Sequence, residues 1–207
     1  MNKKLISHSN YVLRKVLNKK QELDVLKDFI EAILDIEIQE MALNQYLDKK
    51  RKYLPRKEDF GIADLRVKTQ DEEMNIGIQF LDGIYIKTKM LLYYAQIHLN
   101  QTEYNKKRKF VKTITINILD FNYFTDSKYE RRITLKQGNH NLKEIELRVI
   151  ELNKFIEKEK MTKKEEWICY LKGNINKEIL SKIIENNMQI KKLDKMIERY
   201  WLEEKME

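Results

Sequence analysis

Two neighbouring segments of the chain alternate apolar and polar side chains in the manner of β-strands. Residues 63–68 read ADLRVK, and residues 74–80 read MNIGIQF. A period of two is typical of a strand that buries one face. The acidic turn QDEE at 70–73 separates the segments, so we predict that they pair as a β-hairpin. Gly77 is the exception in the pattern, because glycine weakens a strand interior and usually marks a bulge or a close approach.

Apolar residues recur with helical spacing in three other parts of the chain. The spacing predicts a helix from about residue 19 to 34, a second over 84–104 and a helical remainder from about 162. Within that remainder, residues 176–203 form one long amphipathic stretch. Further strands are predicted within 36–47, over 109–121, and in a second hairpin formed by 131–137 and 142–152 around the turn GNHN. This order of elements predicts a mixed α/β or α+β fold.

Composition excludes several classes of protein. A hydrophobic content of 42% is too high for a wholly disordered chain. No run of residues approaches the roughly 18 apolar residues of a membrane span, and the first residues hold no apolar stretch long enough for a signal peptide. Cys169 is the single cysteine, which excludes a disulfide framework. We therefore expect a cytoplasmic protein with no membrane partner.

The charge of the chain permits an acidic partner. The formal net charge is +8 and the isoelectric point is about 9.2, values that favour nucleic acid as the partner. Residues 49–57 and 106–112 both interleave basic and aromatic side chains. A gene rich in A and T, which encodes many Lys, Asn and Ile residues, would give the same composition. Both explanations are open on charge alone.

The predicted hairpin places three residues of chemical interest together. If its apolar residues face the core, then Asp64, Gly77 and Gln79 share the opposite face. A carboxylate beside an amide suits the hydrolysis of a phosphodiester, because Mg²⁺ binds one or two carboxylates together with phosphate and water oxygens and can activate a bound water. One carboxylate and one amide are present, and the second carboxylate is missing.

Several segments, taken in order, resemble a known family. They read SNYVLRKVL, DVLKDFIEAIL, ADLRVKTQDEEMNIGIQ, KTKMLLYYAQIHLNQTEY, TITINILDFNYF, IELNKF and EEWICYLKG. Each is weak alone, but their order and spacing resemble the PD-(D/E)XK nuclease superfamily over nearly the whole chain. Within it, the chain is most similar to the Rpn-type recombination-promoting nucleases, also called PD-(D/E)XK family transposases.

The resemblance implies a fold and an activity. It implies a restriction-endonuclease-like core of about four strands flanked by helices in a nuclease-like domain at 1–160, with a helical C-terminal extension at 161–207 packed on or beside it. The activity it implies is Mg²⁺-dependent cleavage of DNA, linked to recombination or mobile elements. The implied partner is DNA, and a second copy of the chain or a paralogous nuclease is a further candidate.

The resemblance also implies roles for particular residues. Asp64 matches the metal-binding aspartate of the family, and the main-chain carbonyl of Ile78 matches a further metal contact. Gln79 stands where the superfamily has its lysine and would position the water or the scissile phosphate. Gly77 stands where the family has its catalytic glutamate. Asn10 is a smaller departure, because aspartate is frequent there, as is Lys89, where arginine is frequent.

Two explanations of Gly77 compete. The chain is either a degenerate nuclease, retained as a DNA-binding or regulatory partner, or a Glu→Gly variant of a nuclease that harms its host. Both predict little or no Mg²⁺-dependent cleavage and its restoration by Gly77→Glu, because glycine is expected to leave a gap in which the new side chain meets no well-packed neighbour. Glu73 and Asp82 lie too far along the chain to replace the glutamate, whereas Glu31 on the first helix is a candidate. A structural interaction protein without affinity for DNA is a third class.

Other conspicuous side chains are expected in the core rather than in a site. These are Tyr93, Tyr94, Trp167 and Cys169.

Overall fold

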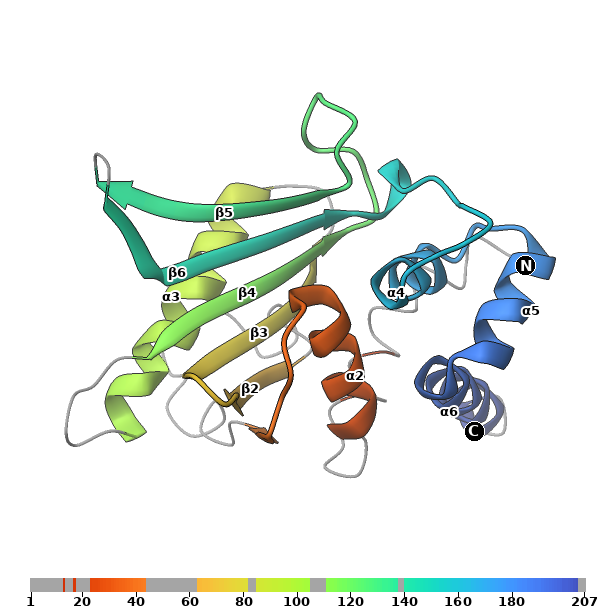
Figure 1. Ribbon diagram of the computed structural model, residues 1–207, viewed down its shortest axis with the longest axis horizontal. Coiled ribbons are helices and arrows are strands. Elements are labelled where there is room, and N and C mark those ends of the chain that lie inside the picture. The colour runs from red at the N-terminus through yellow and green to blue at the C-terminus, as the bar shows by residue number, and fades with distance from the viewer. Residues whose placement is uncertain are drawn as a thin grey trace. The chain divides into compact units, whose positions relative to one another are not determined.

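The computed structural model describes Leu13, Leu17 and residues 23–43, 63–81, 85–104, 111–137 and 140–204 (Figure 1). The chain divides into two compact units. One combines Met1–Glu37 with Phe155–Glu207, and the other is Ile38–Lys154.

Within the described part of Ile38–Lys154, the strands form one mixed six-stranded sheet in the order β1-β2-β3-β4-β6-β5. The pairs β3–β4 and β4–β6 are parallel, and the other pairs are antiparallel. The strands are β1 (Glu40–Leu43), β2 (Ala63–Lys68), β3 (Glu73–Leu81), β4 (Lys112–Leu119), β5 (Glu130–Gln137) and β6 (His140–Glu151). All of the predicted strands are confirmed, including both hairpins.

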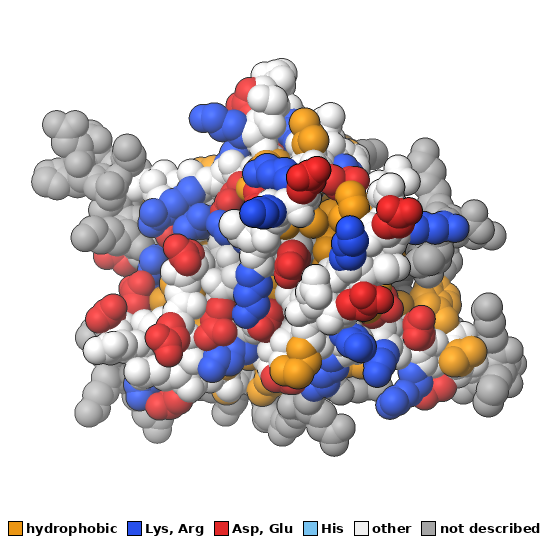
Figure 2. Space-filling view, turned by 45° about the vertical axis from the view of Figure 1, so that its right-hand side comes forward, with side chains coloured by type: hydrophobic (Ala, Val, Ile, Leu, Met, Phe, Trp, Pro, Cys, Tyr) orange, Lys and Arg blue, Asp and Glu red, His pale blue; other side chains and the backbone are white. Residues whose placement is uncertain are grey.

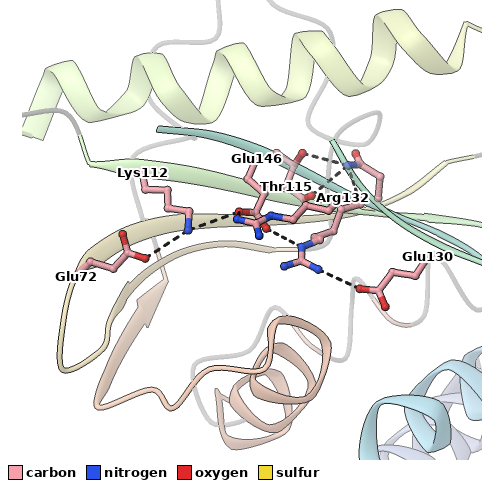
Figure 3. Close-up of polar contacts among 8 residues, drawn as sticks. Glu72, Lys112, Thr115, Glu130, Arg132 and Glu146 are labelled. Atoms are coloured by element: carbon pink, nitrogen blue, oxygen red, sulfur yellow. Dashed lines mark hydrogen bonds and ion pairs between the residues drawn. The ribbon is translucent and has the colours of Figure 1, made fainter. Parts of the chain in front are cut away.

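Helix α3 (Ile86–Tyr104) connects β3 to β4 and lies against one face of the sheet (Figures 1 and 3). Its buried apolar side chains recur every three or four residues, which places them on one side of the helix. These side chains are Ile86, Met90, Tyr93 and Ile97. Parallel strands require such a crossover connection. The helix predicted over 84–104 is therefore confirmed, and it covers the β3–β4 pair.

The central strands are buried on both faces. On β2, Ala63, Leu65 and Val67 are at most 5% exposed, and on β3 the run from Met74 to Gln79 is buried. Strands covered on both faces are common where parallel pairs are flanked by other elements. The polar residues of the β2–β3 hairpin that lie nearest its centre are consequently enclosed as well, although the alternation alone suggested a solvated face.

The helical unit contains α2 (Leu23–Leu34), α4 (Lys163–Lys172), α5 (Lys177–Asn186) and α6 (Met188–Glu204). Trp167 on α4 is 1% exposed and packs edge to face on Phe29 of α2, with the ring centroids 5.4 Å apart. The indole N–H donates to Asp28 at 2.9 Å, which satisfies its polar atom. Trp167 therefore joins α4 to α2. It is a core residue, as predicted, and not a surface on which nucleic-acid bases would stack.

The long amphipathic stretch at 176–203 is two helices in the structure. Asn187 lies between α5 and α6 in an extended conformation, where its side-chain oxygen accepts from the N–H of Ile190 at 3.1 Å. Asparagine is a preferred N-cap residue because its side chain pairs with an otherwise unpaired amide at a helix start. The apolar period continued across this break, so periodicity did not reveal it.

These elements confirm the predicted mixed α/β class. The helices α2, α4, α5 and α6 belong to one compact unit of the chain. The domain boundary at residue 160 stays a prediction. No helix in the described stretches is both long and apolar enough to cross a lipid bilayer. The predicted cytoplasmic location is not tested by this observation.

Candidate active site

The β2–β3 register brings the candidate residues together. Asp64 lies directly opposite Gly77 in the antiparallel pair, and Gln79 follows two residues later on the same face of β3. Asp64 is 5% exposed and Gln79 is 2% exposed. The prediction that these residues share a face is confirmed. They do not lie at the mouth of an open cleft, because their side chains are almost completely buried.

Helix α3 covers this face of the hairpin. The hydroxyl of Tyr93 lies within hydrogen-bond distance of two main-chain oxygens, that of Ala63 at 2.9 Å and that of Ile78 at 3.2 Å. Tyr93 is 3% exposed, which confirms it as a core residue. The hydroxyl has one hydrogen to donate, and the oxygen of Ala63 is its nearer acceptor. The carbonyl of Ile78, which the family resemblance implies as a metal contact, lies beside the same hydroxyl.

A buried amide network fixes the orientation of Gln79. Its Nε2 donates to Oδ1 of Asn117 on β4. Asn117 is fully buried, and its Nδ2 donates to the main-chain oxygens of Arg148 at 2.9 Å and Thr115 at 3.2 Å. Carbonyl oxygens only accept, so the nitrogen of Asn117 must face them and its oxygen must face Gln79. The main-chain oxygens of β4 and β6 orient Asn117, and Gln79 therefore donates to it through Nε2.

Sequence reasoning missed Asn117, although one signal was present. Thr113, Thr115 and Asn117 are the polar positions of β4 after its first residue, and in the parallel register Thr115 lies beside Gly77 and Asn117 beside Gln79. The alternation of polar and apolar residues along β4 could be read from the sequence. The parallel partner and its register were not, since they depend on a crossover rather than on a turn.

Replacing Asn117 with alanine is expected to lower the free energy of unfolding by about 2–4 kcal/mol. The change leaves the amide of Gln79 and two main-chain oxygens buried without these partners, and each lost pairing costs about 1–3 kcal/mol. Denaturation in urea measures the loss. Asn153→Ala is the matched control, because the amide of Asn153 donates to the oxygen of Asp120 at an exposed position. Equal losses for the two variants would contradict the buried network.

His98 and Tyr94 also belong to the packing of α3. The Nδ1 atom of His98 lies 3.1 Å from the hydroxyl of Thr113 and 3.3 Å from that of Tyr94. Burial lowers the pKa of His98, and burial with the nearby charge of Glu144 raises the pKa of Tyr94 to about 12. Both side chains are thus neutral at physiological pH, and His98 joins α3 to β4 through Thr113.

The donor set around Asp64 does not fit a divalent cation. Mg²⁺ is held through carboxylates and other oxygens in near-octahedral geometry. Asp64 supplies one carboxylate, position 77 opposite it carries no side chain, and the amide of Gln79 is paired with Asn117. Within the described residues, no three His, Cys, Asp or Glu side chains are grouped so that they could hold a metal ion. The disagreement with the implied Mg²⁺ site originates at Gly77.

Two other candidate carboxylates, Glu73 and Glu31, lie within the described residues. Glu73 lies at the start of β3, opposite Lys68, and its side chain pairs with Arg66 at the surface. Glu31 lies on α2, in the other compact unit, and its role in completing the site stays a prediction. Asp82 and Asn10 lie outside the described residues, and Lys89 lies on α3.

A six-stranded mixed sheet with helix α3 on one face is consistent with a nuclease-like fold. A family model described as PD-(D/E)XK nuclease family transposase matches residues 8–207 of the chain. The chain belongs to this family. No curated protein and no solved structure matches it.

Proposed function

We propose that the chain is a DNA-binding member of its family whose nuclease site is crippled at Gly77. The implied parent activity is divalent-metal-dependent cleavage of DNA of the transposase-associated type. A protein that binds DNA without cutting it suits the role of a regulatory partner to an active paralogue. The observation that carries the proposal lies at position 77, directly opposite Asp64. Gly77 provides no carboxylate there, and α3 packs into the space that a side chain would occupy.

Charge supports the binding half of the proposal. The supporting fact is the net charge of +8. On the face drawn in Figure 2, basic and acidic side chains are interspersed, so that face does not itself locate a binding surface. The two basic and aromatic segments lie outside the described residues, apart from Val111 and Lys112. Binding through phosphate contacts is expected to be weak and without strong sequence preference.

The test uses the full chain with supercoiled plasmid and with labelled duplex DNA. With Mg²⁺ or Mn²⁺, nicking is expected not to exceed that of an Asp64→Ala preparation. The affinity for duplex is expected to fall at least about tenfold between about 50 and about 200 mM salt, because counterions are released on binding.

Two outcomes would contradict the proposal. Cleavage that Asp64→Ala abolishes would mean that a carboxylate from elsewhere completes the site, and Glu31→Gln would then be the first variant to examine. Binding that is absent at low salt would favour the structural interaction protein instead.

A further inference from the structure

Position 77 is closed by two side chains of α3. A Cβ atom added to Gly77 would overlap the terminal methyl, Cδ1, of Ile97. It would also lie 2.8 Å from Cε1 and 2.9 Å from the hydroxyl oxygen of Tyr93. Carbon atoms that are not bonded pack at about 3.5–4.0 Å. The place where any other residue would begin its side chain is therefore already filled.

The backbone does not need glycine at this position. Within the described residues, the glycine with a left-handed backbone is Gly173, at the end of α4. Gly77 is paired in register on both sides, with Asp64 and with Thr115, so it lies in regular strand rather than in a bulge. Of the usual reasons for glycine inside a strand, close approach of a neighbour is the one that applies.

The contact is part of a well-packed helix–sheet interface. Ile97 is 1% exposed and Tyr93 is 3% exposed, and the hydroxyl of Tyr93 holds the helix to the carbonyls of Ala63 and Ile78. The methyl of Ile97 is the end of a flexible side chain, but the ring of Tyr93 is anchored by these hydrogen bonds. A side chain at position 77 therefore cannot be admitted by one small rotation alone.

We infer that Gly77 and Ile97 are a matched pair, in which Ile97 makes the closest of the contacts that keep a side chain out of position 77. The missing carboxylate has been replaced by packing: Ile97 and Tyr93 occupy the volume in which it would stand. Gly77 is thus integrated into the core of this chain and is not an isolated substitution. The inference deepens the proposed function, on which it rests in identifying position 77 as the site of the lost carboxylate.

A double-mutant cycle tests the pair by stability alone. Gly77→Ala adds one methyl group, and overpacking of this kind is expected to lower the melting temperature by about 2–10 °C. In the Ile97→Ala background the overlap with Ile97 is gone, but the contacts with Tyr93 at 2.8 Å and 2.9 Å remain. The same change is therefore expected to lower the melting temperature by clearly less than it does in the parent. This smaller loss in the Ile97→Ala background is the expected signature.

Ile118→Ala is the matched control. Ile118 is 1% exposed on β4, and its position on the strand places it on the face of the sheet away from α3. Ile118→Ala removes the same atoms as Ile97→Ala, yet Gly77→Ala is expected to destabilise that background as much as it destabilises the parent. If Gly77→Ala raises the melting temperature with Ile97 intact, or if both isoleucine variants relieve it equally, the inference is overturned.

The cycle separates this inference from the proposed function. Asp64-dependent cleavage of DNA together with a smaller loss in the Ile97→Ala background would support the matched pair and overturn the crippled-nuclease proposal. Absence of cleavage together with equal losses in the parent and Ile97→Ala backgrounds would support the proposal and overturn the pair.

Discussion

Gly77→Glu alone is expected to lower the free energy of unfolding by about 3–5 kcal/mol and to leave the protein unable to cleave DNA. Overpacking a core typically costs about 1–3 kcal/mol, and here the added atoms meet Ile97 and Tyr93. The new carboxylate would also be buried opposite Asp64, so that two like charges share one face. Urea denaturation and plasmid nicking with Mg²⁺ measure the two effects.

Gly77→Gln is the control that separates volume from charge. It adds nearly the same atoms without a charge, so it should destabilise less than Gly77→Glu. Introducing Ile97→Ala beside Gly77→Glu should recover part of the lost stability. In that double variant, but not when Ile97→Ala is combined with Gly77→Gln, Mn²⁺ is expected to raise the melting temperature, because a ligand that binds only the folded state stabilises it.

This result would correct the expectation from the sequence, in which a glutamate at position 77 met no packed neighbour. That expectation is wrong in this chain, because α3 fills the space. If Gly77→Glu proves as stable as the parent and restores Asp64-dependent cleavage, the helix yields more readily than its packing indicates.

Glu146→Ala is expected to lower the free energy of unfolding by about 3 kcal/mol. Its side chain is 3% exposed on β6 and accepts from Arg148 at 2.6 Å and from Arg132 at 2.8 Å, with Lys112 at 3.6 Å (Figure 3). Removing one member of a buried ion pair costs about 3–5 kcal/mol. The lower end applies because Arg148 keeps Glu130 and Lys112 keeps Glu72 as partners. Urea denaturation at neutral pH measures the loss.

The loss should depend on pH in a stated direction. Burial raises the pKa of Glu146, but the hydrogen bond and charge of Arg148 and the charges of Lys112 and Arg132 outweigh it and hold the pKa below its usual range. A carboxyl group with a lowered pKa in the folded state contributes its stability above the unfolded value of about 4.3 and loses it as the pH falls through the folded value. The difference between parent and variant should therefore be full at neutral pH and shrink below about pH 4.

Glu72→Ala serves as the control for Glu146→Ala. It removes a partner of the same lysine, but its side chain is 46% exposed, so the loss should be below about 1 kcal/mol. Equal losses at Glu72 and Glu146 would mean that burial does not strengthen the network.

The hairpin that carries the candidate site was predictable because its information is local. Alternation along residues 63–68 and 74–80 and the acidic turn between them set the faces, and the register that pairs Asp64 with Gly77 follows. Helix α3 was likewise readable from its apolar spacing. The reason for Gly77 was not, because it depends on the distance between a strand and a helix that starts several residues further along the chain.

The buried polar contacts were also beyond the sequence. Asn117 and Glu146 read as ordinary polar positions of exposed strand faces until their partners on neighbouring strands are known. Conversely, the resemblance implied roles for Asp64, Ile78 and Gln79 on one hairpin. It could not reveal that Gln79 already pairs with Asn117 or that the hydroxyl of Tyr93 lies against the carbonyl of Ile78.

The strand order has a consequence for how the sheet assembles. The hairpins β2–β3 and β5–β6 join residues close together in the chain, whereas β4 pairs with β3 and with β6 across long connections. Local pairings close small loops and form fast, while distant pairings must first overcome the entropy of closing a long loop. β4 is therefore the strand that unites two early hairpins, and the rate-limiting step in folding is expected to be its insertion between them.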